Sequence, residues 1–71
     1  MNFIYFDGKH INRAKVHYIE KHKVIVNNED VYRVYMYLDL IEVVDFFAES
    51  FQSEEEANER YYEILGHLNS N

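Results

Sequence analysis

The chain has 71 residues, a formal net charge of −6 at pH 7, no Cys, and 48% hydrophobic residues that include seven Tyr and five Phe. A chain of this length predicts one small domain spanning residues 1–71, a size class that often gains stability from disulfides, a metal or self-association. The lack of Cys excludes disulfides and thiolate zinc sites. The aromatic content supplies an ordinary core, so long disordered segments are not expected.

The sequence carries no signal for a membrane or for export. No apolar run reaches the roughly 18 residues needed to cross a bilayer, and the segment MNFIYFDGK lacks the basic region and cleavage site of a signal peptide. We therefore expect a cytoplasmic protein with no membrane partner. The abundance of Phe, Tyr, Ile, Asn and Lys is typical of AT-rich genomes, such as those of low-GC Gram-positive bacteria and their phages.

The first part of the chain predicts two strands joined by a tight turn. Residues 3–6, FIYF, are aromatic and β-branched, and Asp7-Gly8 is a hairpin signal because Gly tolerates positive φ. A second strand is expected from about His10 to Lys21, with alternate side chains inside, namely Ala14, Val16 and Tyr18. Ile19 interrupts this alternation, which indicates either a bulge near it or a partner that covers it.

The middle of the chain predicts further strands. Residues 24–26 (VIV) start or continue a strand, and 27–30 (NNED) form a turn because Asn tolerates the left-handed region. Residues 31–38 alternate strictly and predict a strand whose inward side chains are Tyr32, Val34, Met36 and Leu38. Residues 38–51 fit both a strand and a helical stripe, and we favour a bent or second strand.

Residues 53–68 predict a helix. Ser53 and Glu56 have the spacing of a capping box, and three Glu residues fill the first turn, where the helix dipole favours anions. Arg60 is spaced to pair with Glu56, and one stripe is apolar, comprising Ala57, Tyr61, Ile64, Leu65 and Leu68. The order of elements predicts an α+β fold: a small antiparallel meander of three or four strands with one C-terminal α-helix packed on one face.

The charges are unevenly distributed and give two candidate surfaces. Residues 1–36 hold six Lys/Arg and four Asp/Glu, whereas residues 37–71 hold one Arg and nine Asp/Glu. The candidate interaction face combines cations with aromatic rings on the outer side of the strands: Arg13, Lys15, His17, Ile19, Arg33, Tyr35 and Tyr37. The candidate acidic face lies on the helix: Glu54, Glu55, Glu59 and Glu63.

The interaction face suits three alternatives. It is a solvated sheet surface covered by long side-chain stems, a protein interface, or a platform where single-stranded nucleic acid meets cations and stacks on rings. The net negative charge disfavours nucleic acid, because affinity depends on neutralising phosphates. The acidic face, extended by Asp39, Glu42, Asp45 and Glu49, suggests mimicry of a DNA backbone, although capping and solvation also explain carboxylates on a helix.

No pattern predicts catalysis, a cofactor or a metal site. The four His residues lack the spacing of a metal motif, and two Gly residues do not make a phosphate loop. Acid–base chemistry needs carboxylates with separated pKa values in a cleft, for which a domain this small has little room. We expect a non-enzymatic protein-interaction domain, in concrete form a phage-derived or bacterial accessory or inhibitory protein acting on a host protein. A second copy of the chain is another expected partner.

Overall fold

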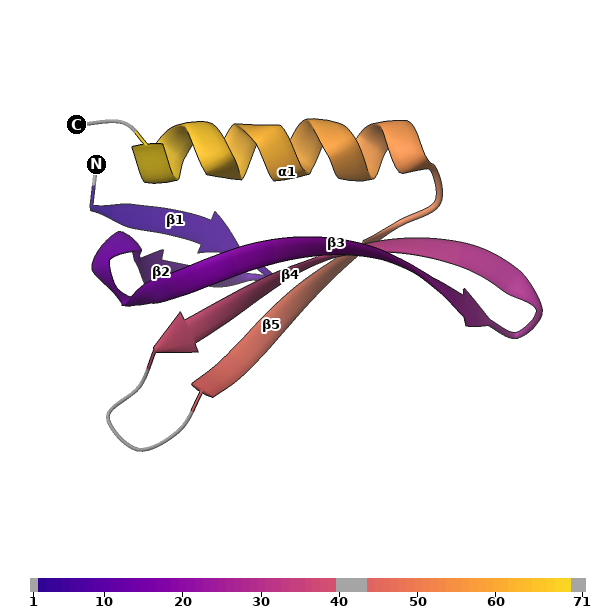
Figure 1. The fold of residues 1–71 in the computed structure, drawn as a ribbon, viewed down its shortest axis with the longest axis horizontal. Coiled ribbons are helices and arrows are strands. Elements are labelled where there is room, and N and C mark those ends of the chain that lie inside the picture. The colour runs from indigo at the N-terminus through magenta and orange to yellow at the C-terminus, as the bar shows by residue number, and fades with distance from the viewer. Residues whose placement is uncertain (1, 40–43, 70–71) are drawn as a thin grey trace.

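A computed structural model describes residues 2–39 and 44–69 and confirms the α+β fold (Figure 1). The first strands form a hairpin, β1 (Phe3–Phe6) and β2 (Lys9–Asn12). A three-stranded antiparallel sheet follows in the order β3 (Val16–Val26), β4 (Glu29–Asp39) and β5 (Val44–Phe51). A 3-10 turn, η1 (Arg13–Lys15), joins the hairpin to the sheet, and helix α1 (Glu54–Asn69) is the last described element.

Both tight turns predicted from the sequence are confirmed. Asp7 and Gly8 have φ values of 51° and 73°, and Asn27 and Asn28 have φ values of 51° and 64°. Two successive residues with positive φ give a turn whose twist matches that of the flanking strands. Asp, Asn and Gly adopt this conformation with little strain. β4 already begins at Glu29, so the second turn is shorter than residues 27–30.

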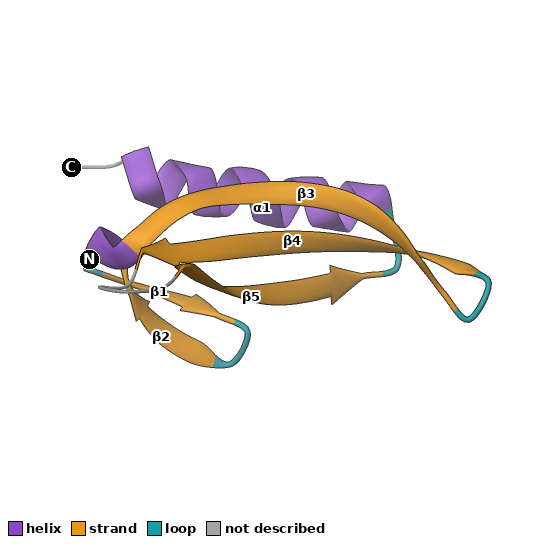
Figure 2. Cartoon of the chain, turned by 60° about the horizontal axis from the view of Figure 1, so that its bottom comes forward, coloured by secondary structure: helices purple, strands orange, loops and turns teal. Residues whose placement is uncertain are grey.

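The helix and the hairpin both lie on one face of the three-stranded sheet (Figures 1 and 2). Their apolar side chains meet those of the sheet in a single core, in which the largest fully buried residues are Phe6, Val34, Met36 and Ile64. This confirms the inward positions predicted on β4 and the apolar stripe predicted on α1. Tyr32, Tyr61, Leu65 and Leu68 are partly buried at the margin of the same core.

The segment predicted as one strand from His10 to Lys21 is divided by η1. Asn12 starts this turn, because its Oδ1 accepts a hydrogen bond from the backbone N of Ala14 at 2.9 Å. The pairing of β3 with β4 then shifts between Val16 and Tyr18. The inward placement of Ala14 and Tyr18 is therefore wrong, since both are exposed. Ile19 is buried opposite Met36, as the bulge alternative predicts.

The ambiguous segment forms a strand where the structure describes it. β5 pairs antiparallel with β4 from Val44 opposite Asp39 to Phe51 opposite Tyr32. Residues 40–43, which include part of the alternative helical stripe, lie outside the described residues. β5 ends opposite Tyr32. The end of the β3–β4 hairpin that holds the Asn27-Asn28 turn therefore extends beyond β5 (Figure 2).

Helix α1 begins where the sequence predicts. The Ser53 Oγ accepts a hydrogen bond from the backbone N of Glu56 at 3.2 Å, and the carbonyl of Ser53 accepts one from Ala57 N at 3.3 Å. This half of the capping box satisfies backbone donors that a helix start leaves without partners. Arg60, however, pairs with Glu49 and Glu63 rather than with Glu56.

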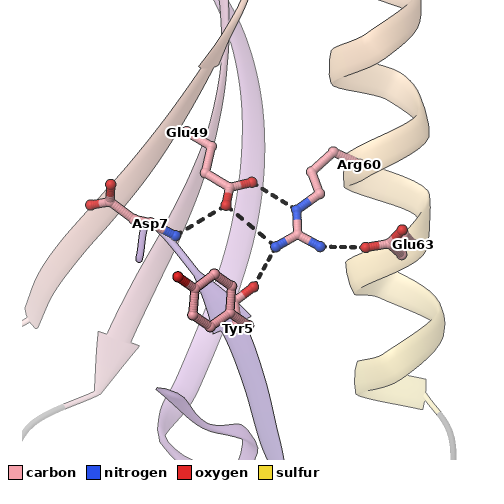
Figure 3. Close-up of polar contacts among 5 residues, drawn as sticks. All are labelled: Tyr5, Asp7, Glu49, Arg60 and Glu63. Carbon is pink, nitrogen blue, oxygen red and sulfur yellow. Dashed lines mark hydrogen bonds and ion pairs between the residues drawn. The ribbon is translucent and has the colours of Figure 1, made fainter. Parts of the chain in front are cut away.

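Arg60 connects the helix, the sheet and the hairpin (Figure 3). Its Nε donates to the Glu49 Oε1 at 2.7 Å and its Nη2 to the Oε2 at 3.3 Å. The same Oε2 accepts a bond from the backbone N of Asp7 at 3.0 Å, and Arg60 also donates to the carbonyl of Tyr5 and to Glu63. Partial burial lowers the pKa of Arg60, but bonds and charges from Glu49 and Glu63 outweigh this and raise it.

We predict that Ile64→Ala lowers the free energy of unfolding by roughly 2–5 kcal/mol, because a fully buried side chain leaves a cavity that the core cannot fill. The neighbouring Leu65→Ala, at the partly exposed margin, is the matched control and should cost clearly less. Urea unfolding of both variants measures the difference. Equal losses would contradict the packing of α1 through Ile64.

We predict that Glu49→Gln lowers the free energy of unfolding by about 1–3 kcal/mol, because the Arg60 guanidinium loses its charged acceptor in a partly buried position. The Glu49 side chain is 21% exposed, whereas that of Glu63 is 57% exposed. Glu63→Gln is therefore the control and should cost under about 1 kcal/mol. Thermal and urea unfolding that rank the two variants in the opposite order would show that the Glu49 contact does not hold the layers together.

Candidate functional site

The face of the sheet opposite the helix carries four aromatic side chains from three strands. Side chains alternate along a strand, so the residues between the core positions of β4 point away from α1. Tyr37 of β4 lies opposite Tyr18 of β3 and opposite Phe46 of β5, and Tyr35 lies one step along β4. We call this surface the aromatic face, defined by Tyr18, Tyr35, Tyr37 and Phe46.

The rings of the aromatic face hold one another in place. Tyr18 and Tyr37 are stacked, with ring centroids 4.4 Å apart and an interplanar angle of 14°. Phe46 lies with its ring centroid 5.8 Å from those of both Tyr35 and Tyr37. Tyr18 and Phe46 nevertheless keep 41% and 52% of their surface exposed, because none of the described elements covers this side of the sheet (Figure 2).

The polar side chains beside the rings carry both signs of charge. Glu20 and His22 of β3 are in contact, with the His22 Nε2 2.8 Å from the Glu20 Oε2. On β4, Arg33 donates from its Nε to the Ser50 Oγ at 3.2 Å, and Asp39 lies exposed at the other end of the strand. The surroundings of the aromatic face therefore carry both signs of charge, with one Arg beside two carboxylates.

The surroundings of Tyr37 alter the acidity of its hydroxyl. Its pKa is raised above 10.0, first because neighbouring groups partly remove its hydroxyl from water, and then because the carboxylate of Glu20 opposes a second negative charge. The Glu20 carboxylate also accepts a hydrogen bond from the Tyr37 hydroxyl. This contact ties β3 to β4 on the open side of the sheet.

The structure brings together only part of the predicted interaction face. Arg33, Tyr35 and Tyr37 share the open side as predicted, and the ring of His17 contacts that of Tyr18 with centroids 5.1 Å apart. Arg13 and Lys15 instead lie in η1, where Arg13 donates to the carbonyl of His67 at 3.1 Å. Ile19 belongs to the core, because the register shift turns it inward.

Two further cations, both on β3, lie on the helix side of the sheet. Lys21 and Lys23 pair with the core positions Val34 and Tyr32. The Lys21 ammonium donates to the Asn58 Oδ1 at 2.7 Å and lies 5.0 Å from the ring centroid of Tyr61. Both lysines line a shallow concavity of ≈ 270 Å³ beside the start of α1. The cations of η1 and β3 therefore do not form one basic surface.

The four residues of the predicted acidic face all lie on α1, but its predicted extension does not follow them. Glu54, Glu55, Glu59 and Glu63 are exposed on the helix, and Glu63 also binds Arg60. In the preceding segment, Asp45 and Glu49 pair with core positions of β4, whereas Asp39 belongs to the open side, so these carboxylates do not share one surface. Glu42 lies outside the described residues.

Two members of the aromatic face were missed from the sequence. The alternation of residues 10–21 places Tyr18 in the core, because the sequence leaves the bulge near Ile19 as one of two alternatives. Phe46 lies in the segment that fits both a strand and a helix. The out-of-phase Ile19 was the available signal: a bulge that turns Ile19 inward also turns Tyr18 outward.

Within residues 2–39 and 44–69, no helix is long and apolar enough to cross a membrane. In the same residues, no three His, Asp or Glu side chains gather closely enough to hold a metal ion. Comparison of the chain with protein-family models, with curated proteins and with solved structures finds no match.

We predict that Glu20→Gln lowers the pKa of Tyr37 toward the usual value of about 10, because the opposing negative charge is removed. A raised pKa means that the fold favours the neutral phenol. The stability that the neutral Tyr37 phenol contributes is therefore present below pH 10.0 and is lost as the pH rises through the folded-state pKa. NMR titration of the Tyr37 ring measures the shift. Glu29→Gln, at the start of β4, is the control. If it lowers the pKa of Tyr37 as much as Glu20→Gln does, the charge of Glu20 is not what raises that pKa.

Proposed function

We propose that the chain is a small, non-enzymatic cytoplasmic interaction domain that binds another protein through its aromatic face. The observation that carries the proposal is the set of four mutually packed rings on the open side of the sheet, with Phe46 52% exposed and Tyr18 41% exposed. Contiguous exposed aromatic surface of this kind often marks a binding site. Its concrete role in this proposal is that of an accessory or inhibitory partner of a host protein.

The packing of the rings supports a protein partner. Tyr residues contribute strongly to protein interfaces because they bury a large apolar area and keep a polar group for hydrogen bonding. Tyr18, Tyr37 and Phe46 already restrict one another's rotation through their ring contacts. Less side-chain entropy is then lost on binding than would be lost from separate, mobile side chains.

Nucleic acid is less well supported as the partner. Stacking on Tyr35 or Tyr37 suits a base, but affinity for a single strand also needs cations that follow its phosphates. Beside the rings, Arg33 and His22 are accompanied by Glu20 and Asp39. Arg13 and Lys15, which the sequence assigned to the same surface, lie in η1. Mimicry of DNA is likewise weakened, because Arg60 binds two of the carboxylates.

We predict that Tyr35→Glu weakens binding to a protein partner at least tenfold, because it places a charge within the aromatic face, beside Tyr37 and Phe46. Tyr62→Glu makes the same chemical change on α1, where Tyr62 is 61% exposed, and is the matched control. Proteins retained from a bacterial lysate by the Tyr62→Glu chain but not by the Tyr35→Glu chain would be purified and titrated against all three chains. Self-association of the same chains would be measured by sedimentation.

Two results would overturn the proposal. One is that Tyr35→Glu and Tyr62→Glu behave alike toward every purified partner, including the chain itself. The other is salt-sensitive binding of a single-stranded oligonucleotide that is lost in Arg33→Glu, which would assign the face to nucleic acid instead. Circular dichroism of each variant establishes that it remains folded.

A further inference from the structure

The open side of β4 has opposite charges at its two ends. Its outward residues include, in order, Arg33, Tyr35, Tyr37 and Asp39, with Met36 buried at the midpoint between them. Strand geometry places Arg33 and Asp39 about 20 Å apart, each roughly 10 Å from the level of Met36. The outward side of β4 therefore presents a cation, two rings and an anion in that order. In a second β4 that runs antiparallel to the first, the cation and the anion exchange places.

We infer that the partner of the aromatic face is a second copy of the chain, packed sheet against sheet about a two-fold axis that crosses β4 at the level of Met36. This inference rests on the proposed function of the face. A two-fold axis in the plane of contact lays β4 antiparallel across the β4 of its partner. Arg33 then lies opposite Asp39 of the partner, and Tyr35 lies opposite Tyr37.

The neighbouring strands fit the same axis. Ile19 and Phe47 pair with Met36, so they mark the level of the axis on β3 and β5. On β5, the large ring of Phe46 then falls opposite the small Ala48 of the partner. On β3, the hydroxyl of Tyr18 falls opposite the carboxylate of Glu20, which can accept its hydrogen bond.

Self-association explains the charge pattern better than an unrelated partner does. A two-fold interface uses the same patch on both subunits, so the patch must be complementary to itself. The outward side chains of all three strands meet this requirement around the same two-fold axis. Opposite charges face each other on β4, a hydrogen-bond donor faces an acceptor on β3, and a large side chain faces a small one on β5. Sheets that pack in this way lie about 10 Å apart and cross at roughly 30°. Because β4 is the central strand of the sheet, its contacts lie in the middle of the interface.

The test uses charge reversal, with sedimentation as the measurement. Arg33→Glu and Asp39→Arg should each weaken the dimer at least tenfold, because each places like charges opposite one another at two equivalent positions. An equimolar mixture of the two variants should associate again, since every pair across the heterodimer then has opposite charges. Lys15→Glu, in the exposed η1, is the control and should associate like the unaltered chain.

The mixture also shows whether a variant lost association through its charge or through unfolding, because two unfolded variants would not associate again when mixed. A chain that stays monomeric at high micromolar concentration, or a dimer that neither reversal weakens, overturns the inference. If the monomeric chain still binds a purified heterologous protein in a Tyr35-dependent manner, the proposed function stands without self-association. If neither a second copy nor any other protein binds in a Tyr35-dependent manner, the proposed function and this inference both fail.

Discussion

The shift in pairing between Val16 and Tyr18 determines which side chains face the core and which face outward. Because strand side chains alternate with a period of two, a displacement of one residue exchanges the two faces of the strand. It moves Ile19 into the core and Tyr18 onto the open side, where its ring stacks on Tyr37 at 4.4 Å. Without the shift, a tyrosine hydroxyl would be buried and an isoleucine exposed, and the aromatic face would lack its ring on β3.

The polar contacts of Arg60 and Glu49 complement this arrangement on the helix side. A two-stranded hairpin is at best marginally stable alone, and β1–β2 forms a sheet separate from β3–β5. The apolar side chains of Ile4, Phe6 and Ile11 supply its main attachment to the core. Glu49 and Arg60 then fix its orientation, since one carboxylate accepts bonds from the hairpin turn and from the helix.

Local patterns in the sequence predicted the parts of the fold that are determined locally. The Asp7-Gly8 turn, the alternation in residues 31–38 and the cap at Ser53 each involve residues close together in the chain, and each is confirmed. The η1 turn and the register shift were not resolved in advance, because they depend on how β3 meets β4. The candidate site failed at the same positions: Arg33, Tyr35 and Tyr37 lie on β4, whose alternation is unbroken, whereas Arg13, Lys15 and Ile19 lie in or beyond the interruption.

The placement of charge in the fold is compatible with contact through the aromatic face despite the net charge of −6. The exposed Glu54, Glu55 and Glu59 are on α1, on the far side of the sheet from Tyr18 and Phe46. In a face-to-face pair, two sheets about 10 Å apart lie between the helices, and each helix adds about another 10 Å. The two acidic helices are then roughly 30 Å apart, several times the Debye length of about 8 Å at physiological salt, so their repulsion is largely screened. The charged residues that come into contact are instead Arg33, Asp39 and Glu20, which include both signs of charge, so an acidic chain can present a surface suited to its own copy.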